Sequence, residues 1–202
     1  MKKPAKPKKK SPKAKKSVGA KKLGAAYYAQ SKRLGFRLVE AGDEALYTNL
    51  FTDAKALEHF MKPLSREAAK QSFDKAVRYS RQTPWKQRVT VIVSRGTQKP
   101  LGIASIRLVS ADNRTAEVGI LLKPGAQAKS FASEASTALL NSAFRRYGID
   151  GIVAAVAEGH KIGELLVKRL GYARGDQLAP SGVRGVRTEW TMSREEWASN
   201  YK

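Results

Sequence analysis

The chain has 202 residues, no cysteine, 42% hydrophobic residues and a formal net charge of +22. This length predicts one domain with an appendage, and the absence of thiols excludes disulfides, thiolate zinc sites and a cysteine nucleophile. No apolar run is long enough to span a bilayer, and no apolar stretch follows the basic N-terminus. We therefore expect neither a membrane span nor a secretory signal, and a cytoplasmic location.

Residues 1–33 are predicted to be a disordered basic tail, and residues 34–202 the folded domain. The tail holds twelve Lys and one Arg without any acidic residue, so it carries +13 and leaves +9 for the rest of the chain. Residues 1–22 contain three prolines and almost no apolar side chain to offset the entropy of ordering. Residues 23–34 are predicted to be a short, helical transition.

The Lys/Ala/Pro composition of this tail resembles the tails of histone H1-like proteins. A tail of this composition can tether the protein to nucleic acid or to the ribosome through phosphate contacts. It can equally be a nuclear localisation signal, or a tail that only keeps the protein soluble. Association with a nucleoid, or a nuclear location in a eukaryote, are the corresponding alternatives to a plain cytoplasmic protein.

The first half of the domain is predicted to hold one strand followed by helices. Asp43 is a plausible N-cap for the first helix and Ser65 for the third, whose apolar residues recur with a period near 3.6. The expected elements are a strand at 36–40 and helices at 45–51, 53–61 and 65–79.

The second half reads as a meander followed by crossovers. Strands are expected at 88–94, 101–109 and 116–122, then a long helix ended by Gly148, a strand at 152–156, a helix at 162–170 ended by Gly171, a strand at 186–192 and a terminal helical turn capped by Ser193. This order predicts an α/β (α+β) domain, with a mixed, mostly antiparallel sheet of six to seven strands and helices on both faces.

Four stretches carry a family resemblance: AEVGILLKP (116–124), QAKSFASEA (127–135), AFRRYGIDGIVAAV (143–156) and GELLVKRLGYARG (163–175). With the order of elements, they resemble the GNAT superfamily of N-acetyltransferases, and within it the branch of ribosomal-protein N-terminal acetyltransferases. The resemblance implies the GNAT fold, acetyl-coenzyme A as co-substrate, no metal, and a protein or other amine as acceptor. The oligomeric state and the acceptor itself stay open.

The resemblance places coenzyme A on the strand at 116–122 and on the loop and helix after it. A loop that runs into a helix N-terminus offers free N–H groups and a positive dipole end to a pyrophosphate. Gln127 and Ala132 match the family pattern, whereas Ser130 replaces its central glycine and is less suited to a positive φ. The candidate binding residues are Ile120, Leu121, Leu122, Gln127, Ala128, Lys129, Ser130, Phe131, Ala132 and His160.

Two positions of the last helical motif depart from the family. His160 stands where the family often has an asparagine on the cofactor; it is either a cofactor contact and proton carrier or an exposed loop residue. Val167 stands where some relatives have a tyrosine general acid, so that acid is missing. The other histidine, His59, is expected to be structural or exposed, and two histidines without acidic partners predict no metal site.

Glu117 is the candidate catalytic base, because this branch usually carries glutamate there. In this family the amine attacks the thioester directly, so catalysis needs positioning, a base for the ammonium proton and a donor to the carbonyl. A backbone N–H near Gly119–Leu121 is the expected donor. The alternative for Glu117 is a sheet-face carboxylate paired with Arg or Lys.

The acceptor is expected to meet residues 50–85 and the 176–186 loop, with Phe60, Tyr79 and Trp85 as candidate lining. Three functions stay open: an acetyltransferase for a protein α-amine or lysine, a catalytically degenerate GNAT domain that binds nucleic acid, and a small-molecule amine acetyltransferase. The basic composition counts against the third, because a cationic substrate prefers an acidic cleft.

Overall fold

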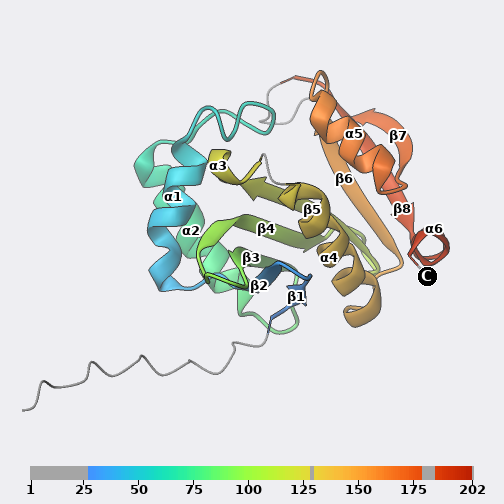
Figure 1. The fold of residues 1–202 in the computed structure, drawn as a ribbon, viewed down its shortest axis with the longest axis horizontal. Coiled ribbons are helices and arrows are strands. Elements are labelled where there is room, and N and C mark those ends of the chain that lie inside the picture. The colour runs from blue at the N-terminus through green and yellow to red at the C-terminus, as the bar shows by residue number, and fades with distance from the viewer. Residues whose placement is uncertain (1–26, 128–129, 179–184, 202) are drawn as a thin grey trace, which may run out of the picture.

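A computed structural model describes residues 27–127, 130–178 and 185–201. They form a single eight-stranded sheet in the order β1-β2-β3-β4-β5-β6-β8-β7, with helices on both faces (Figure 1). The expected tail up to residue 26, Ala128, Lys129 and part of the 176–186 loop lie outside the described residues.

The elements follow one another in the order shown in Figure 1. They are β1 (Ala29–Gln30), β2 (Leu34–Leu38), the 3-10 turn Ala41–Asp43, α1 (Glu44–Thr52), α2 (Arg66–Ser80), β3 (Gln87–Ser94), β4 (Pro100–Leu108), β5 (Thr115–Leu122), α3 (Pro124–Gln127), α4 (Phe131–Arg146), β6 (Gly151–Ala157), α5 (Lys161–Arg169), β7 (Ala173–Leu178), β8 (Arg187–Ser193) and α6 (Arg194–Asn200).

The mixed, mostly antiparallel sheet is confirmed, but it has eight strands instead of six or seven. The two additional strands lie at the sheet edges. β1 has two residues, and β7 reads ARGDQL, a mostly exposed polar segment without hydrophobic alternation. An edge strand of this kind depends on its pairing partner, so periodicity does not reveal it.

Two expected helices are absent from the described residues. The segment 53–61 forms successive turns, in which the Asp53 carboxylate accepts hydrogen bonds from the N–H groups of Lys55 (2.8 Å) and Ala56 (3.1 Å). This is the bonding of a helix N-cap, but the turns that follow do not continue as a helix. The expected helix at 23–34 is not present from residue 27 onward, where β1 pairs with β2.

Several end signals are confirmed. The Ser65 and Ser193 side chains accept hydrogen bonds from the third N–H of α2 and of α6, respectively. Gly171 has φ +86 directly after α5. Asp43 precedes α1 as expected, but its carboxylate binds Arg37 and the Glu40 N–H and makes no cap bond.

Alternate residues of the central strands pack on opposite faces of the sheet. Val91 and Val93 of β3 join the cluster under α1 and α2, whereas Ile92 joins the cluster under α4. A third cluster, around Phe144 and Trp190, joins α4, α5 and α6 to β6 and β8. The central strands of the sheet are therefore covered by helices on both faces. No helix among the described residues has the length and apolarity to cross a bilayer.

An ion pair fixes the start of α1. The Asp43 carboxylate, 6% exposed, accepts from both terminal nitrogens of Arg37 at 2.7 Å, and these hydrogen bonds raise the pKa of Arg37. We expect Asp43→Asn to lower the free energy of unfolding by about 2 kcal/mol, because a charged bidentate contact is lost without a change in shape. Urea denaturation measures the loss.

The matched control for this prediction is Glu40→Gln. Glu40 lies 3.5 Å from the same guanidinium, but its side chain is 61% exposed. We expect an effect below about 0.5 kcal/mol. Equal losses in the two variants would contradict the assignment of α1 anchoring to Asp43.

Candidate functional site

β5 and β6 are paired over only part of their length. Their parallel ladder joins residues 115–117 to residues 151–153 and stops there, although β5 continues to Leu122 and β6 to Ala157. The two strands diverge beyond the ladder. Facing backbone groups in the divergent part are thus left for another partner.

The hydrogen bonds between β4 and β5 show which backbone N–H groups of β5 point toward β6. Val109 donates to Thr115, and Lys123 donates to Leu101, so alternate residues of β5 between them are bonded to β4. By this alternation Gly119 and Leu121 direct their N–H groups to β4, whereas Val118 and Ile120 direct theirs toward β6.

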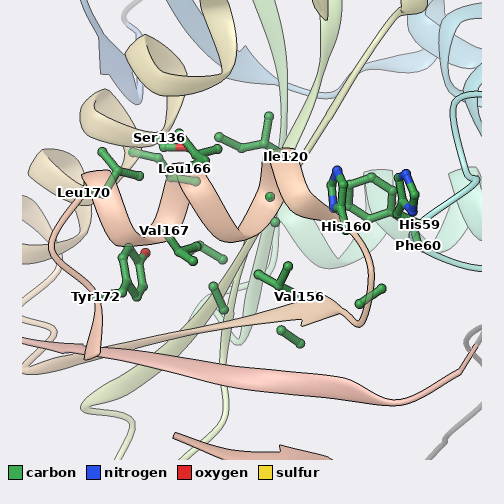
Figure 2. Close-up of a pocket in the computed structure, with 17 residues that line it drawn as sticks. His59, Phe60, Ile120, Ser136, Val156, His160, Leu166, Val167, Leu170 and Tyr172 are labelled. Atoms are coloured by element: carbon green, nitrogen blue, oxygen red, sulfur yellow. The ribbon is translucent and has the colours of Figure 1, made fainter. Parts of the chain in front are cut away.

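The divergence opens a cavity of about 130 Å³ between β5, β6, α4 and α5, here named the inter-strand cavity. Its walls are mostly apolar. At one end are His59, Phe60 and His160, and at the other are Val167, Leu170 and Tyr172 (Figure 2). Burial raises the pKa of Tyr172, so its hydroxyl stays protonated.

A second cavity, of about 320 Å³, opens beside the first and is named the entrance cavity. It contains six of the predicted binding residues: Ile120, Leu121, Leu122, Gln127, Ala132 and His160. Phe131 does not line it; its ring lies 4.5 Å below the Arg33 guanidinium. The structure therefore brings together most of the described residues predicted to bind coenzyme A.

A third cavity, of about 280 Å³, lies on the opposite face of the sheet and is named the α1 cavity. It shares Gly119 and Ile120 with the inter-strand cavity, and Phe60 lines all three cavities. Of the aromatic residues expected in the acceptor groove, only Phe60 is there. Trp85 packs on Tyr147, and Tyr79 lies beside Arg78.

Glu117 lies on the same sheet face as the α1 cavity. It is two residues from Gly119 along β5 and is ion-paired to Arg107, its cross-strand partner on β4. Its side chain lines none of the three cavities and is 32% exposed. The structure thus contains the ion pair that was the alternative to a catalytic role for Glu117, two residues along β5 from Gly119, which lines the cavity.

The two histidines of the chain meet across the entrance cavity. Their rings stack with centroids 4.1 Å apart and planes 14° apart, and Phe60 lies edge-on to His160 at 6.1 Å. Gly163 permits this arrangement, because a Cβ there would come within 2.5 Å of Nδ1 of His160. This stack holds the loop after α1 against the start of α5.

His59 was expected to be structural or exposed, but it lines both the inter-strand and entrance cavities. No sequence signal pairs it with His160, a hundred residues away. Among the described residues no group of three or more His, Asp or Glu side chains could hold a metal ion.

Ser130 adopts a left-handed backbone at the N-cap of α4, with φ 55 and ψ 19, and its side chain makes no cap bond. The position thus has the positive φ that favours glycine. We expect Ser130→Gly to raise the free energy of unfolding by about 1 kcal/mol, through relief of this strain. Thermal or urea denaturation measures the change.

Asn113→Gly is the matched control, because Asn113 has φ 60 in a surface turn. Asparagine tolerates the left-handed region, so we expect a change near zero. A loss of stability in Ser130→Gly would show that the serine hydroxyl is used in the folded state.

The folded protein favours the neutral state of His160. Burial lowers the pKa of His160 below 6.5, His59 lowers it further, and Glu164 and Glu58 oppose the shift. Because the folded pKa is below the unfolded one, the stability from this preference is full above pH 6.5 and is lost as pH falls toward the folded pKa. When the pH falls from about 7.5 to about 5.5, we expect the free energy of unfolding to fall less in His160→Gln than in the parent protein.

Denaturation midpoints at the two pH values measure this difference. His59→Gln should weaken the pH dependence only in part, because burial, the larger cause of the shift, remains. Identical pH profiles for parent and His160→Gln would rule out His160 as the titrating group.

Solved structures with the same fold include acetyltransferases. Spermidine N-acetyltransferase from Vibrio cholerae, in complex with CoA and spermine, has a TM-score of 0.71 and 18% identity, covering 83% of this chain and 99% of its own. A GNAT-family acetyltransferase from Bacillus anthracis has a TM-score of 0.70 and 16% identity, covering 83% and 98%. The ribosomal L7/L12 alpha-N-protein acetyltransferase RimL, in complex with coenzyme A, has a TM-score of 0.69 and 16% identity, covering 81% and 95%.

At these identities the structures establish the fold alone. No curated protein matches the sequence significantly. The family model described as "Acetyltransferase (GNAT) domain" matches residues 33–173. That span includes β5, the start of α4, β6 and α5, the elements that form the inter-strand and entrance cavities. The chain therefore belongs to the GNAT acetyltransferase family and is, by family, an acyl-coenzyme A-dependent N-acetyltransferase.

Proposed function

We propose that this protein transfers the acetyl group of acetyl-coenzyme A to the α-amine or a lysine of a protein. The observation that supports this best is the meeting of two cavities at Gly119 and Ile120, from opposite faces of the sheet. A donor in the inter-strand cavity and an acceptor in the α1 cavity can meet there without a covalent enzyme intermediate.

The donor site uses groups that the fold leaves unpaired. The N-terminus of α4 offers N–H groups and a dipole to the pyrophosphate, beside Gln127 and Ala132. The pantetheine arm fits between the divergent parts of β5 and β6, where the backbone of Val118 and Ile120 can complete a short ladder. The apolar walls suit its alkyl parts.

The chemistry is a direct displacement. Once the ammonium group has lost one proton, the neutral amine nitrogen bonds to the thioester carbon and the Ile120 N–H stabilises the developing oxyanion. The C–S bond then breaks to release the thiolate, and the second proton of the nitrogen passes to water. Glu117 accepts the ammonium proton, directly or through a water molecule, while Arg107 holds its carboxylate. Val167 offers no acid, so the thiolate leaves unassisted at that position.

The charge distribution favours a protein acceptor in a polyanionic setting. Residues 1–33 carry +13 and the rest of the chain +9. Such charge attracts RNA, DNA or an acidic protein surface. We propose that it concentrates the enzyme near nucleic acid or the ribosome, in line with the ribosomal-protein acetyltransferase among the similar structures.

The acceptor cavity disfavours polyamines, the substrates named for the Vibrio cholerae relative. Among the residues that the structure describes, no Asp, Glu, Lys or Arg lines the α1 cavity, so each additional ammonium group would be desolvated there without a counter-charge. Peptides and spermidine, offered with acetyl-coenzyme A and followed by mass spectrometry, test this choice. Acetylation of spermidine alone would overturn the proposed acceptor class.

A catalytically degenerate domain is the second candidate, favoured by the strained Ser130 and by Val167. Calorimetric titration of acetyl-coenzyme A into the full chain distinguishes it, in about 0.5 M salt to screen the tail. Saturable one-site binding supports the enzyme. Absence of binding in both the parent and Ser130→Gly would leave the degenerate domain as the better account.

Glu117→Gln tests the base. We expect kcat to fall about 100-fold while the Kd for acetyl-coenzyme A stays within about twofold, because only proton acceptance is lost. Release of free coenzyme A measures the rate. Arg107→Gln serves as the control: it removes the ion pair and keeps the carboxylate, so a smaller loss is expected. Unchanged kcat in Glu117→Gln would assign Glu117 to a structural role.

A further inference from the structure

The α1 cavity has two chemically different ends. Its apolar end is formed by Tyr47 and Phe51 of α1, by Leu57 and Met61 of the following loop, and by Ile103 and Leu121 on the sheet. The rings of Tyr47 and Phe51 stack with centroids 4.4 Å apart. The Tyr47 hydroxyl is 3.0 Å from that of Ser72, which does not line the cavity, so Tyr47 contributes mainly its ring.

The other end of the cavity is polar and lies toward the reaction centre. Gln87 and Ser105 line it beside Gly119, and the next pair on the same face of β4 and β5 is Arg107 and Glu117. Within the described part of the chain, neither the Gln87 amide nor the Ser105 hydroxyl makes a side-chain hydrogen bond to another residue. Both groups are available to a polar ligand.

This arrangement orients any acceptor that enters. An amine is most stable at the polar end, where it is beside Gly119 and within range of the thioester. A group attached to the amine-bearing carbon then extends toward Phe51 and Leu57, where only hydrocarbon and aromatic surface can meet it. Burial of a large apolar side chain there strengthens the binding of the acceptor.

We infer that the acceptor is the α-amine of a polypeptide whose first residue carries a large apolar side chain, such as leucine, methionine or phenylalanine. This inference rests on the proposed function and specifies its substrate. An α-amine is attached to a branched carbon, so one branch fills the apolar end while the chain leaves past Gln87 and Ser105. A lysine ε-amine has an unbranched stem and brings no group for the apolar end.

The experiment uses the full chain, acetyl-coenzyme A and peptides of one common sequence that differ only in the first residue. Leu, Met and Phe peptides should exceed Ser and Asp peptides by about 10- to 100-fold in kcat/KM. Two further substrates are an Nα-blocked peptide with an internal lysine and phenethylamine, an apolar amine without a peptide chain.

Phe51→Ala tests the cavity itself, with Tyr79→Ala as control, an exposed aromatic on α2 that does not line it. The readout is the ratio of kcat/KM for the Leu peptide to that for the Ser peptide, which does not depend on the fraction of enzyme that is folded. We expect Phe51→Ala to lower this ratio at least about fivefold and Tyr79→Ala to leave it unchanged.

Each outcome decides between the inference and the proposed function. Equal rates for all first residues, or a ratio unchanged in Phe51→Ala, would overturn the inference and keep the protein acetyltransferase. Acetylation of the internal lysine alone would also overturn only the inference. Phenethylamine as the preferred substrate would place the function with small amines. Acetylation of none of these substrates, despite binding of acetyl-coenzyme A, would overturn the proposed function itself.

Discussion

The separation of β5 from β6 is the constraint on which the functional part of the structure depends. A parallel pair normally continues its ladder, and ending it early leaves backbone donors and acceptors without protein partners. A cluster of apolar side chains packs α4 and α5 on β5 and β6 where the two strands diverge, and a second cluster packs α1 and α2 on the other face of β3, β4 and β5. The same divergence creates the inter-strand cavity and leaves Val118 and Ile120 directed into it.

The loop between α1 and α2 connects the donor and acceptor sides. Phe60 lines all three cavities, and the stacked pair of His59 and His160 attaches this loop to the start of α5. Movement of one loop would therefore change both sites together. A structural reason follows for glycine at position 163, where a side chain would displace the His160 ring.

Charged side chains are distributed unevenly between the α1 cavity and the rest of the protein. No charged side chain of the described residues lines the α1 cavity, while Glu117 and Arg107 neutralise each other on the neighbouring strands β5 and β4. The basic excess belongs to the rest of the surface and to the N-terminal segment, where it can attract polyanions without interfering with the approach of an amine. Backbone strain is found at the start of α4. There Ser130, a residue with a Cβ, adopts a left-handed backbone conformation.

The sequence by itself determined the order of the central elements, the caps at Ser65 and Ser193, and the glycine stop at Gly171, because these signals act between residues close in the chain. It also located six of the fourteen residues that line the entrance cavity, five of them between Ile120 and Ala132, whereas the lining from residues 55–59 and from α5 was not anticipated. Only the tertiary structure decided the edge strands, the turns at 53–61, the contact of His59 with His160 and the two ends of the α1 cavity. The contact of His59 with His160 and the α1 cavity join segments tens of residues apart, and the edge strands depend on pairing with a neighbouring strand, so no local pattern records them.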